Sequence, residues 1–399
     1  MKVAVTPSGP VEGYRVAVTG LGALTCAGVG VEALWDALLK DVAPPSKRIA
    51  PFDATHIGGP KELRRLDPFS LYGLMAADEA WLQSGLEGPI VDAGSIVTTG
   101  IGGLQTVLEQ FRVLNEKGPD RVSPFMVPMM MPNAATAAVS MRFGLGGPAE
   151  TVTTACAAGT HAIGNAARLV ATGRCSVAVA GGAEAVIVEI AEAGFRNMTA
   201  LSNEGLSRPF DTQRNGFVMG EGAGILILEQ WDHAVARGAT IYAEVIGAAS
   251  TADAHHITAP DPKGSGAIRC MELALADAGI SAADVSHINA HGTSTPLNDL
   301  AEAIAVRRVF GEHAPPVTSI KGHLGHSLAA AGALEGVVSV LTLLNQTITP
   351  TAGTTEVDPA VGLDVVIGAP RRAEIDVVLS NSFGFGGHNG SVVFRRVQA

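Results

Sequence analysis

The sequence contains little charge, and positive charge is the scarcer sign. Only 16% of its 399 residues are charged, and 27 Lys and Arg stand against 38 Asp and Glu, which gives a formal net charge of -11 at pH 7. Nucleic acids and anionic membranes bind basic protein surfaces. The composition therefore argues against both as main partners, and an acidic protein partner would require a local basic patch.

Cysteine is also scarce and shows no pairing pattern. The four cysteines are Cys26, Cys156, Cys175 and Cys270. They form no CxxC pair and no zinc-site spacing with histidine, so we expect reduced thiols in a cytoplasmic protein, with neither disulfides nor a metal.

Long apolar runs are missing too. The first twenty residues, "MKVAVTPSGPVEGYRVAVTG", contain no sustained hydrophobic segment. The longest uncharged stretch, "VSPFMVPMMMPNAATAAVSM", is interrupted by prolines and an asparagine. The sequence therefore predicts neither export nor a membrane span.

Short β-branched runs alternate with Ala- and Leu-rich helical patterns along the whole chain. Examples are "GSIVTTG" followed by "LQTVLEQFRVLNEKG", and "TIYAEVIGAAS" followed by "GAIRCMELALADAGI". This alternation predicts an α/β fold with covered sheets. The chain is long enough for two compact halves, and we place them at residues 1–240 and 241–399.

The two halves resemble each other weakly. "ETVTTA" leads into Cys156 and a small-residue helix, whereas "PPVTSIKGHLGH" leads into His326 and "SLAAAGALEGVVSVL". A duplicated α/β unit that presents one reactive side chain per half would give this pattern. Helices rich in alanine and glycine also look alike by composition, so periodicity alone leaves the duplication open.

Cys156 stands out within "TTACAAG". A lone buried cysteine is most often inert packing. However, a strand followed at once by a helix places Cys156 near a helix N-terminus, where free backbone N–H groups stabilise a thiolate and an oxyanion. The small neighbours leave space for a substrate carbonyl, so a nucleophile is the alternative interpretation.

Two further segments could serve such a nucleophile. "NAHGTSTPLND" contains His291, and "SIKGHLGHSLAAAGALEG" contains Lys321, His326 and Glu335. A cysteine with two histidines at strand ends is suited to acyl transfer, although each histidine alone could be structural. A metal site at His323 and His326 is the poorer interpretation, because no third ligand lies at suitable spacing.

A glycine-rich loop, "SNSFGFGGHNG", lies near the C-terminus. Its glycines let backbone N–H groups approach a ligand. It matches neither GxGxxG nor GxxxxGK[ST], so nucleotide binding is not indicated.

Together these segments resemble the β-ketoacyl-acyl carrier protein synthases of the elongating, type II kind, which are members of the thiolase-fold superfamily. The resemblance runs from "VAVTGLGALTCAGVG" to "NSFGFGGHNG" and includes "TACAAG", "NAHGTSTP" and "KGHLGH" in family order. It implies an α/β, five-layer αβαβα fold of two duplicated halves, the first carrying the nucleophilic cysteine and the second the histidines and the glycine-rich gate loop.

The resemblance also implies residue roles. Cys156 would accept the acyl chain, and the N–H groups of Cys156 and Phe385 would form the oxyanion hole. His291 and His326 would stabilise the enolate formed when malonyl-acyl carrier protein loses its carboxylate. Lys321 and Glu335 would be the supporting polar pair. The residues expected to bind the substrate are Thr258, Thr293, Thr295, Phe195, Ile101 and Met130.

The implied partner is an acyl carrier protein, whose phosphopantetheine carries the substrates, so no separate cofactor is expected. Several positions differ from the family pattern, among them Gly322, His388, Thr199 and Asp120. Because two usual basic contacts are lost at Thr199 and Asp120, docking is expected at Lys61, Arg64 and Arg65 and on a specialised carrier protein.

The same resemblance suggests a homodimer, although a heterodimer with a chain-length-factor-like partner stays open. Two other functions fit the sequence less well. A non-decarboxylating thiolase usually employs a second cysteine as base, and neither Cys175 nor Cys270 lies in such a motif. A non-enzymatic chain-length factor lacks the nucleophile, whereas Cys156 is present.

Overall fold

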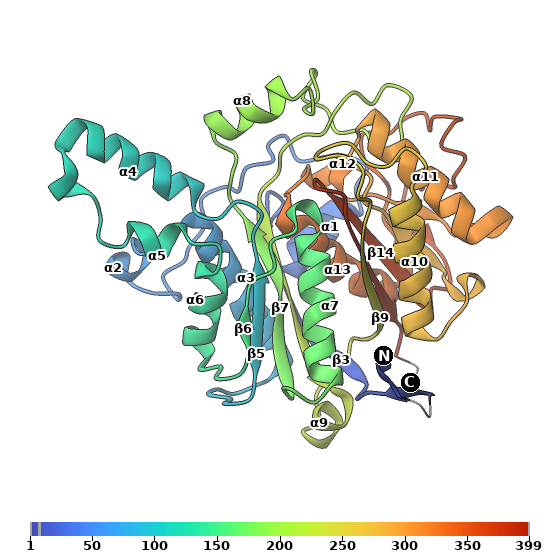
Figure 1. The fold of residues 1–399 in the computed structure, drawn as a ribbon, viewed down its shortest axis with the longest axis horizontal. Helices are drawn as coiled ribbons and strands as arrows, with labels where there is room; N and C mark the ends of the chain where they lie inside the picture. Colours follow the sequence, from blue (N-terminus) through green and yellow to red (C-terminus); the bar gives the residue numbers. More distant parts are fainter. Residues whose placement is uncertain (1, 7–8, 398–399) are drawn as a thin grey trace.

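The computed structural model describes residues 2–6 and 9–397, and most of its strands join in one long mixed sheet (Figure 1). The strands of the first half are β3 (Val16–Thr25), β5 (Gly94–Thr98), β6 (Ala149–Glu150), β7 (Val177–Glu184) and β8 (Gly222–Gln230). Those of the second half are β9 (Ala243–Ala252), β10 (His287–Asn289), β11 (Val317–Thr318), β14 (Val377–Gly384) and β15 (His388–Arg395).

Both halves have the same strand order. The first half runs β6-β5-β7-β8-β3 and the second runs β11-β10-β14-β15-β9, so each places its third, second, fourth, fifth and first strands side by side. In each half the first three strands of this order are parallel to one another and the last two alternate in direction. The identical topology confirms the predicted duplication, and antiparallel pairing of β3 with β9 joins the halves.

The molecule has five layers, of which the two halves of the sheet form two and helices form three (Figure 1). The central layer contains α7 (Ala158–Ala171) and α13 (Ala329–Asn345), which contact each other and both halves of the sheet. Helices α3 (Pro68–Ser84) and α6 (Ala134–Phe143) cover the outer face of the first half. Helices α10 (Ser265–Ala278) and α11 (Pro296–Phe310) lie outside the second. The predicted αβαβα arrangement is therefore confirmed.

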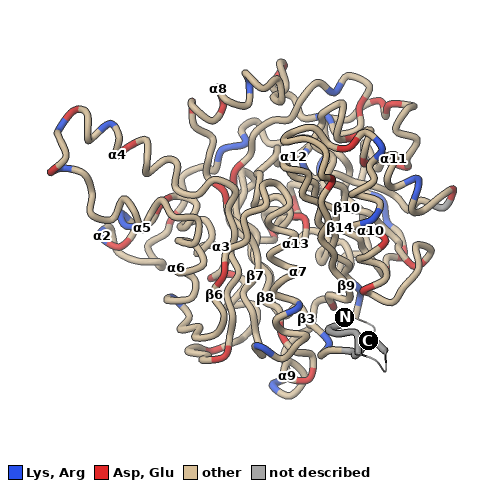
Figure 2. Tube along the Cα trace, viewed as in Figure 1, with Lys and Arg blue, Asp and Glu red and all other residues tan. Residues whose placement is uncertain are grey.

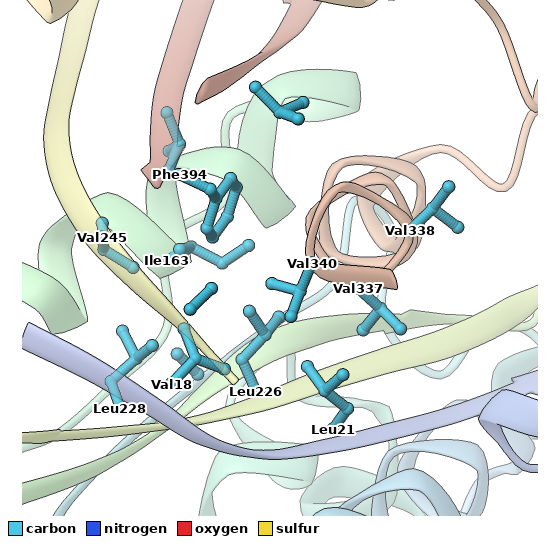
Figure 3. Packing of buried hydrophobic residues seen from close by; sticks show 14 of the residues in the cluster. Val18, Leu21, Ile163, Leu226, Leu228, Val245, Val337, Val338, Val340 and Phe394 are labelled. Atoms are coloured by element: carbon cyan, nitrogen blue, oxygen red, sulfur yellow. The ribbon is translucent and has the colours of Figure 1, made fainter. Parts of the chain in front are cut away.

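Small and apolar residues explain the buried central layer. Helix α13 is buried around its whole circumference, as expected from "AAAGALEGVVSVLTLL". Figure 3 shows Val337 and Val340 of this helix packed towards Leu21 and Leu226. A side chain at Gly159 of α7 would place its Cβ 2.5 Å from the Ala333 nitrogen, so this glycine allows the two helices to touch.

The other elements are short or peripheral. They are β1 (Lys2–Thr6), β2 (Gly9–Glu12), β4 (Gly28–Val29), α1 (Val31–Leu38), α2 (Pro60–Leu63), α4 (Leu104–Lys117), η1 (Pro119–Arg121), α5 (Met126–Met130), η2 (Ala155–Ala157), α8 (Glu189–Asn197), α9 (Trp231–Ala236), η3 (Ala282–Asp284), η4 (Gly311–His313), α12 (Lys321–Leu324), β12 (Thr347–Ile348) and β13 (Arg371–Arg372). Helices α4 and α5 form a protrusion that extends away from the body (Figure 1).

One local expectation is wrong. The sequence predicts that the run "ETVTTA" is a strand up to Cys156, but β6 contains only Ala149 and Glu150. The threonines that follow bond the neighbouring strand region through their hydroxyls instead, with Thr151 Oγ1 donating to the Val97 carbonyl at 3.3 Å and Thr153 Oγ1 to the Thr99 carbonyl at 3.2 Å.

Candidate active site

Cys156 lies in the single turn η2 directly before α7. Ala155, just before it, has a φ of 49°, a left-handed conformation that is unusual for a residue with a side chain. This sharp turn aims the thiol at a cavity of about 360 Å³, where Cys156 is 7% exposed. The predicted position near a helix N-terminus is thus observed.

The glycine-rich loop closes over the sulfur. The backbone N–H groups of Phe385 and of Cys156 itself face the thiol. A Cβ added at Gly384 would lie 2.9 Å from the Thr154 oxygen and 3.0 Å from the Cys156 nitrogen, so only glycine fits there. Two backbone donors at one sulfur are the geometry expected of an oxyanion hole.

His291 and His326 enter the same cavity from the second half. His291 follows β10, and His326 lies between α12 and α13. Their ring centroids are 5.4 Å apart with planes at 84° to each other. Three residues that are far apart in sequence therefore surround one cavity.

Lys321 and Glu335 form a buried ion pair behind the histidines. Lys321 Nζ also donates to the His291 carbonyl at 2.6 Å and lies 3.4 Å from His291 Nδ1. A cation at Nδ1 disfavours a proton on that nitrogen, so the neutral ring carries its proton on Nε2, the other ring nitrogen.

Both histidines are neutral at pH 7. Burial lowers the pKa of His291 well below the ordinary histidine value, and the positive charge of Lys321 lowers it further. The same two causes, in the same order, lower the pKa of His326. Each ring can therefore donate one N–H and accept one hydrogen bond.

The protonation state of Cys156 differs from the thiolate that the sequence predicts. Burial raises the pKa of Cys156 to about 11, although the nearby Lys321 and the Phe385 N–H oppose this shift. The cost of burying the charge outweighs the helix N-terminus. The resting nucleophile is therefore a thiol.

Four of the expected substrate residues line the cavity, namely Phe195, Thr258, Thr293 and Thr295. The hydroxyls of Thr293 and Thr295 lie 2.9 Å apart. Ile101 and Met130 are not among the cavity residues; they are 40% and 37% exposed, and Met130 lies on the protrusion. Their expected role in acyl binding stays a prediction, because the single chain leaves these side chains at its surface.

The basic residues expected to dock a carrier protein lie at α2 and its end. Lys61, Arg64 and Arg65 are all exposed. Figure 2 shows positively charged residues beside α2 and α5. The Arg65 guanidinium lies 4.4 Å from the Phe125 ring centroid, so it also ties α2 to the base of α5.

Sequence reasoning missed two carboxylates on α11. Glu302 accepts the N–H groups of His291 and Gly292, each at 2.8 Å, and Asp299 accepts that of Thr293 at 2.9 Å. Burial raises the pKa of Glu302 to about 8. Their spacing of three residues, one helical turn, was the available signal, since it places both on one face of α11.

Glu184 was missed as well. Its carboxylate accepts Thr99 Oγ1 and Gly100 N, each at 2.8 Å, and Ala329 N at 3.3 Å. It thereby connects the loop after β5 to the first turn of α13. Burial raises the pKa of Glu184 to about 7.

No group of three or more His, Cys, Asp or Glu side chains in residues 2–6 and 9–397 is placed to hold a metal ion. Within the same ranges, no helix has both the length and the apolar character required to cross a membrane.

Comparison with known proteins identifies the family. Family models described as the N-terminal and C-terminal domains of beta-ketoacyl synthase match residues 45–234 and 242–355. The chain is 42% identical to 3-oxoacyl-[acyl-carrier-protein] synthase 2 of Synechocystis sp., over 97% of this chain and 99% of that protein.

Solved structures agree. The ishigamide ketosynthase/chain length factor aligns with a TM-score of 0.90 and 31% identity, over 97% of this chain and all of that one. A ketosynthase in complex with a type II PKS acyl-carrier protein aligns with a TM-score of 0.87 and 32% identity, over the same shares. The expected resemblance is confirmed, and this chain belongs to the beta-ketoacyl synthase family.

Proposed function

We propose that this enzyme catalyses the decarboxylating Claisen condensation of a Cys156-bound acyl chain with malonyl-acyl carrier protein, giving 3-ketoacyl-acyl carrier protein. One observation carries the proposal: Cys156, His291 and His326 surround one cavity, with the Phe385 N–H at the sulfur. This arrangement supplies a nucleophile, an oxyanion hole and two donors for an enolate.

In the first half-reaction, the Cys156 sulfur attacks the acyl thioester of the carrier protein. The oxygen of the tetrahedral intermediate accepts the N–H groups of Cys156 and Phe385. The carbon–sulfur bond to phosphopantetheine then breaks, and the thiol proton of Cys156 passes to the leaving sulfur. A resting thiol suits this step, because no buried thiolate has to be maintained between turnovers.

In the second half-reaction, the malonyl thioester loses carbon dioxide. The electron pair of the broken carbon–carbon bond stays on the thioester, which becomes an enolate. Neutral His291 and His326 each donate an N–H to the enolate oxygen, and Lys321 favours the Nε2–H form of His291. The enolate carbon attacks the acyl-Cys156 carbonyl, the carbon–sulfur bond breaks, and Cys156 takes up one proton. The chain leaves two carbons longer.

The substrates are proposed to arrive on the phosphopantetheine of an acyl carrier protein, with Thr258, Thr293 and Thr295 holding its arm. Lys61, Arg64 and Arg65 would bind the acidic carrier surface. We propose a homodimer, in which Ile101 and Met130 complete the acyl pocket. Because the nucleophile must stay a free thiol, a reducing cytoplasmic location is proposed.

Fatty acid elongation is the better supported pathway, since identity is 42% to a 3-oxoacyl-[acyl-carrier-protein] synthase 2 but 31% to the ketosynthase/chain length factor structure. The second candidate is the ketosynthase subunit of a type II polyketide synthase with a chain-length-factor partner. The high TM-scores to such assemblies favour it. A thiolase-type reaction is disfavoured, because among the described cavity residues Cys156 is the single cysteine.

The test is mass spectrometry of the intact enzyme after incubation with acyl carrier proteins bearing acyl chains of several lengths. Wild type and a Cys26→Ala control should gain one acyl group, and Cys156→Ala should gain none. Cys156→Gln, which mimics the acylated state, should release carbon dioxide from malonyl-acyl carrier protein without forming a 3-ketoacyl product. Absence of an acyl adduct on every chain length would overturn the proposal.

A further inference from the structure

A second cavity, of about 650 Å³, adjoins the active-site cavity. We call it the rear cavity and define it by Lys47, Arg48, Arg196, Ser207, Arg208 and Phe217. Phe217 also lines the active-site cavity, so its ring forms part of the wall between the two. None of the mechanistic steps above uses the rear cavity.

The rear cavity is positively charged, although the protein as a whole is strongly negative. Among its described lining residues, one lysine and three arginines face a single carboxylate, Glu192. Arg48 lies 3.3 Å from Glu192, and Arg208 pairs with Glu204 at 2.8 Å. Two of the four cations are thus already balanced by carboxylates.

The other two cations are not balanced within the described part of the chain, where neither Lys47 nor Arg196 has a carboxylate within 4.0 Å. Lys47 Nζ donates to the Pro44 carbonyl at 3.1 Å and to the His323 carbonyl. Burial lowers its pKa, so its charge is partly desolvated without an ion partner. An anion in the cavity would relieve this cost.

A buried hydroxyl and an apolar wall complete the rear cavity. Ser207 is 8% exposed, and its hydroxyl has no hydrogen-bond partner within residues 2–6 and 9–397. The hydroxyl oxygen is itself buried, so it lies within the wall of the rear cavity and does not face its free space. Leu201 and Met219 supply apolar surface beside it. The lining thus fits an anionic head and an apolar body.

The wall between the cavities leads directly to a catalytic histidine. The Phe217 ring meets the His326 ring edge-on, with centroids 5.3 Å apart. The backbone N–H of His326 donates to the Val218 carbonyl at 2.7 Å, and the backbone N–H of Gly220 donates to the His326 carbonyl at 2.9 Å. A shift of residues 217–219 would therefore move His326.

We propose that the rear cavity binds a small amphipathic anion, with one carboxylate or phosphate head and a short apolar body, and that its occupancy changes the rate of the step that uses His326. The binding stands independently of the proposed function, whereas the change in rate rests on it. A fatty carboxylate and an alkyl phosphate share this chemistry, and both are used as probes.

Binding is measured by titration calorimetry of octanoate and octyl phosphate, with octanol as the uncharged control. The protein is first alkylated at Cys156, which obstructs the active-site cavity. Arg196→Gln should weaken binding about tenfold, because a charge-assisted hydrogen bond is lost. Lys47→Gln with Arg196→Gln should weaken it further, and Lys117→Gln on α4 should leave it unchanged.

The expected result is one site that prefers the anions over octanol, and the tighter anion identifies the head group. Equal affinity for octanol, unchanged binding in Arg196→Gln, or no binding by any probe would overturn the site. The side chain of Arg196 makes no hydrogen bond within the described chain and its backbone carbonyl accepts one, so its variant is expected to fold. With unalkylated enzyme, saturating anion should change the rate of malonyl decarboxylation in wild type but not in Arg196→Gln.

An unchanged rate in wild type with the site filled would overturn the coupling to His326. Failure of the proposed function looks different, because malonyl decarboxylation would then be absent with and without the anion while calorimetric binding stayed intact.

Discussion

The state of the Cys156 thiol is set by two opposing effects. The start of α7, Lys321 and the Phe385 N–H favour a thiolate, but burial favours the thiol and dominates, raising the pKa to about 11. Cys156 therefore differs from solvent-exposed reactive cysteines, whose pKa is lowered. In the proposed mechanism, reactivity would therefore come from the donors that receive the thioester oxygen rather than from a sulfur ionised beforehand.

Alkylation of Cys156 should consequently increase with pH far beyond the ordinary cysteine range. We expect the iodoacetamide rate to rise until an apparent pKa of about 11, since only the thiolate reacts. Rates are followed by peptide mass spectrometry between pH 7 and the highest pH at which circular dichroism shows folded protein, with N-acetylcysteine as control. A plateau below pH 9 would contradict the burial argument.

The contact between strand β14 and the turn η2 depends on one missing side chain. A Cβ at Gly384 would approach two backbone atoms of residues 154–156 at 3.0 Å or less, and backbone cannot move aside cheaply. Gly194 in α8 is the matched control, because a Cβ there meets nothing within 4 Å.

Gly384→Ala should therefore slow acylation of Cys156 by roughly 100-fold or more, because a displacement of about 1 Å misaligns the oxyanion donors. Gly194→Ala should keep its acylation rate and gain about 0.5–1 kcal/mol of stability, since alanine is the better helix residue. Stopped acylation mixtures analysed by mass spectrometry give the rates, and thermal unfolding gives the stabilities. Equal rates in both variants would contradict the proposed fit.

Strands with a clear run of buried apolar residues could be predicted from the sequence. A segment held by side-chain hydrogen bonds could not. Strands β7, β8 and β9 follow from continuous small and β-branched runs, because both of their faces are buried. The run Thr151–Thr154 has the same composition but lies at the sheet edge, where its hydroxyls replace strand pairing.

The candidate site shows the same division. Cys156, His291 and His326 were recognisable because their motifs carry chemistry. Glu302 and Glu184 act by accepting backbone N–H groups; the spacing from Asp299 to Glu302 was a weak signal for Glu302, whereas the bond from Gly100 to Glu184 leaves no motif in the sequence. Ile101 and Met130 lie at the surface of this chain, so their role in acyl binding stays a prediction. The division at residue 240 stays a prediction.

The protein as a whole carries a net negative charge, and the basic residues at α2 are a local exception to it. If they bind an acidic carrier protein, Arg64→Glu should raise the KM for acyl carrier protein about fivefold and leave kcat unchanged, since an exposed contact of about 1 kcal/mol is lost. Lys117→Glu, an equal change of charge on α4, should have little effect. The difference should shrink in high salt. Equal KM values for both variants would contradict docking at α2.

The two halves of the molecule are joined at β3 and β9, and one carboxylate secures that joint. Glu244 of β9 is 5% exposed and bonds Arg15 and Arg395 at 2.8 Å each. Burial opposes its ionisation, but the bonds to Arg15 and Arg395 prevail and lower its pKa. Its charged form therefore stabilises the folded state above the ordinary glutamate range, and this contribution is lost as pH falls through the lowered pKa.

Glu244→Gln should reduce the free energy of unfolding by about 2 kcal/mol at pH 7, because both arginines are partly exposed and solvent screens them. The loss should diminish at a second, more acidic pH below the lowered pKa of Glu244, where the wild-type carboxylate is itself protonated. Urea unfolding at both pH values measures the change, with exposed Glu87→Gln as control.

Since three residue pairs join the sheet halves at β3 and β9, weakening this joint by Glu244→Gln should also make unfolding less cooperative. Probes in β7 and in β14 should then report separate midpoints. A single shared midpoint with an unchanged free energy would mean that the packing of α7 against α13 alone holds the halves together.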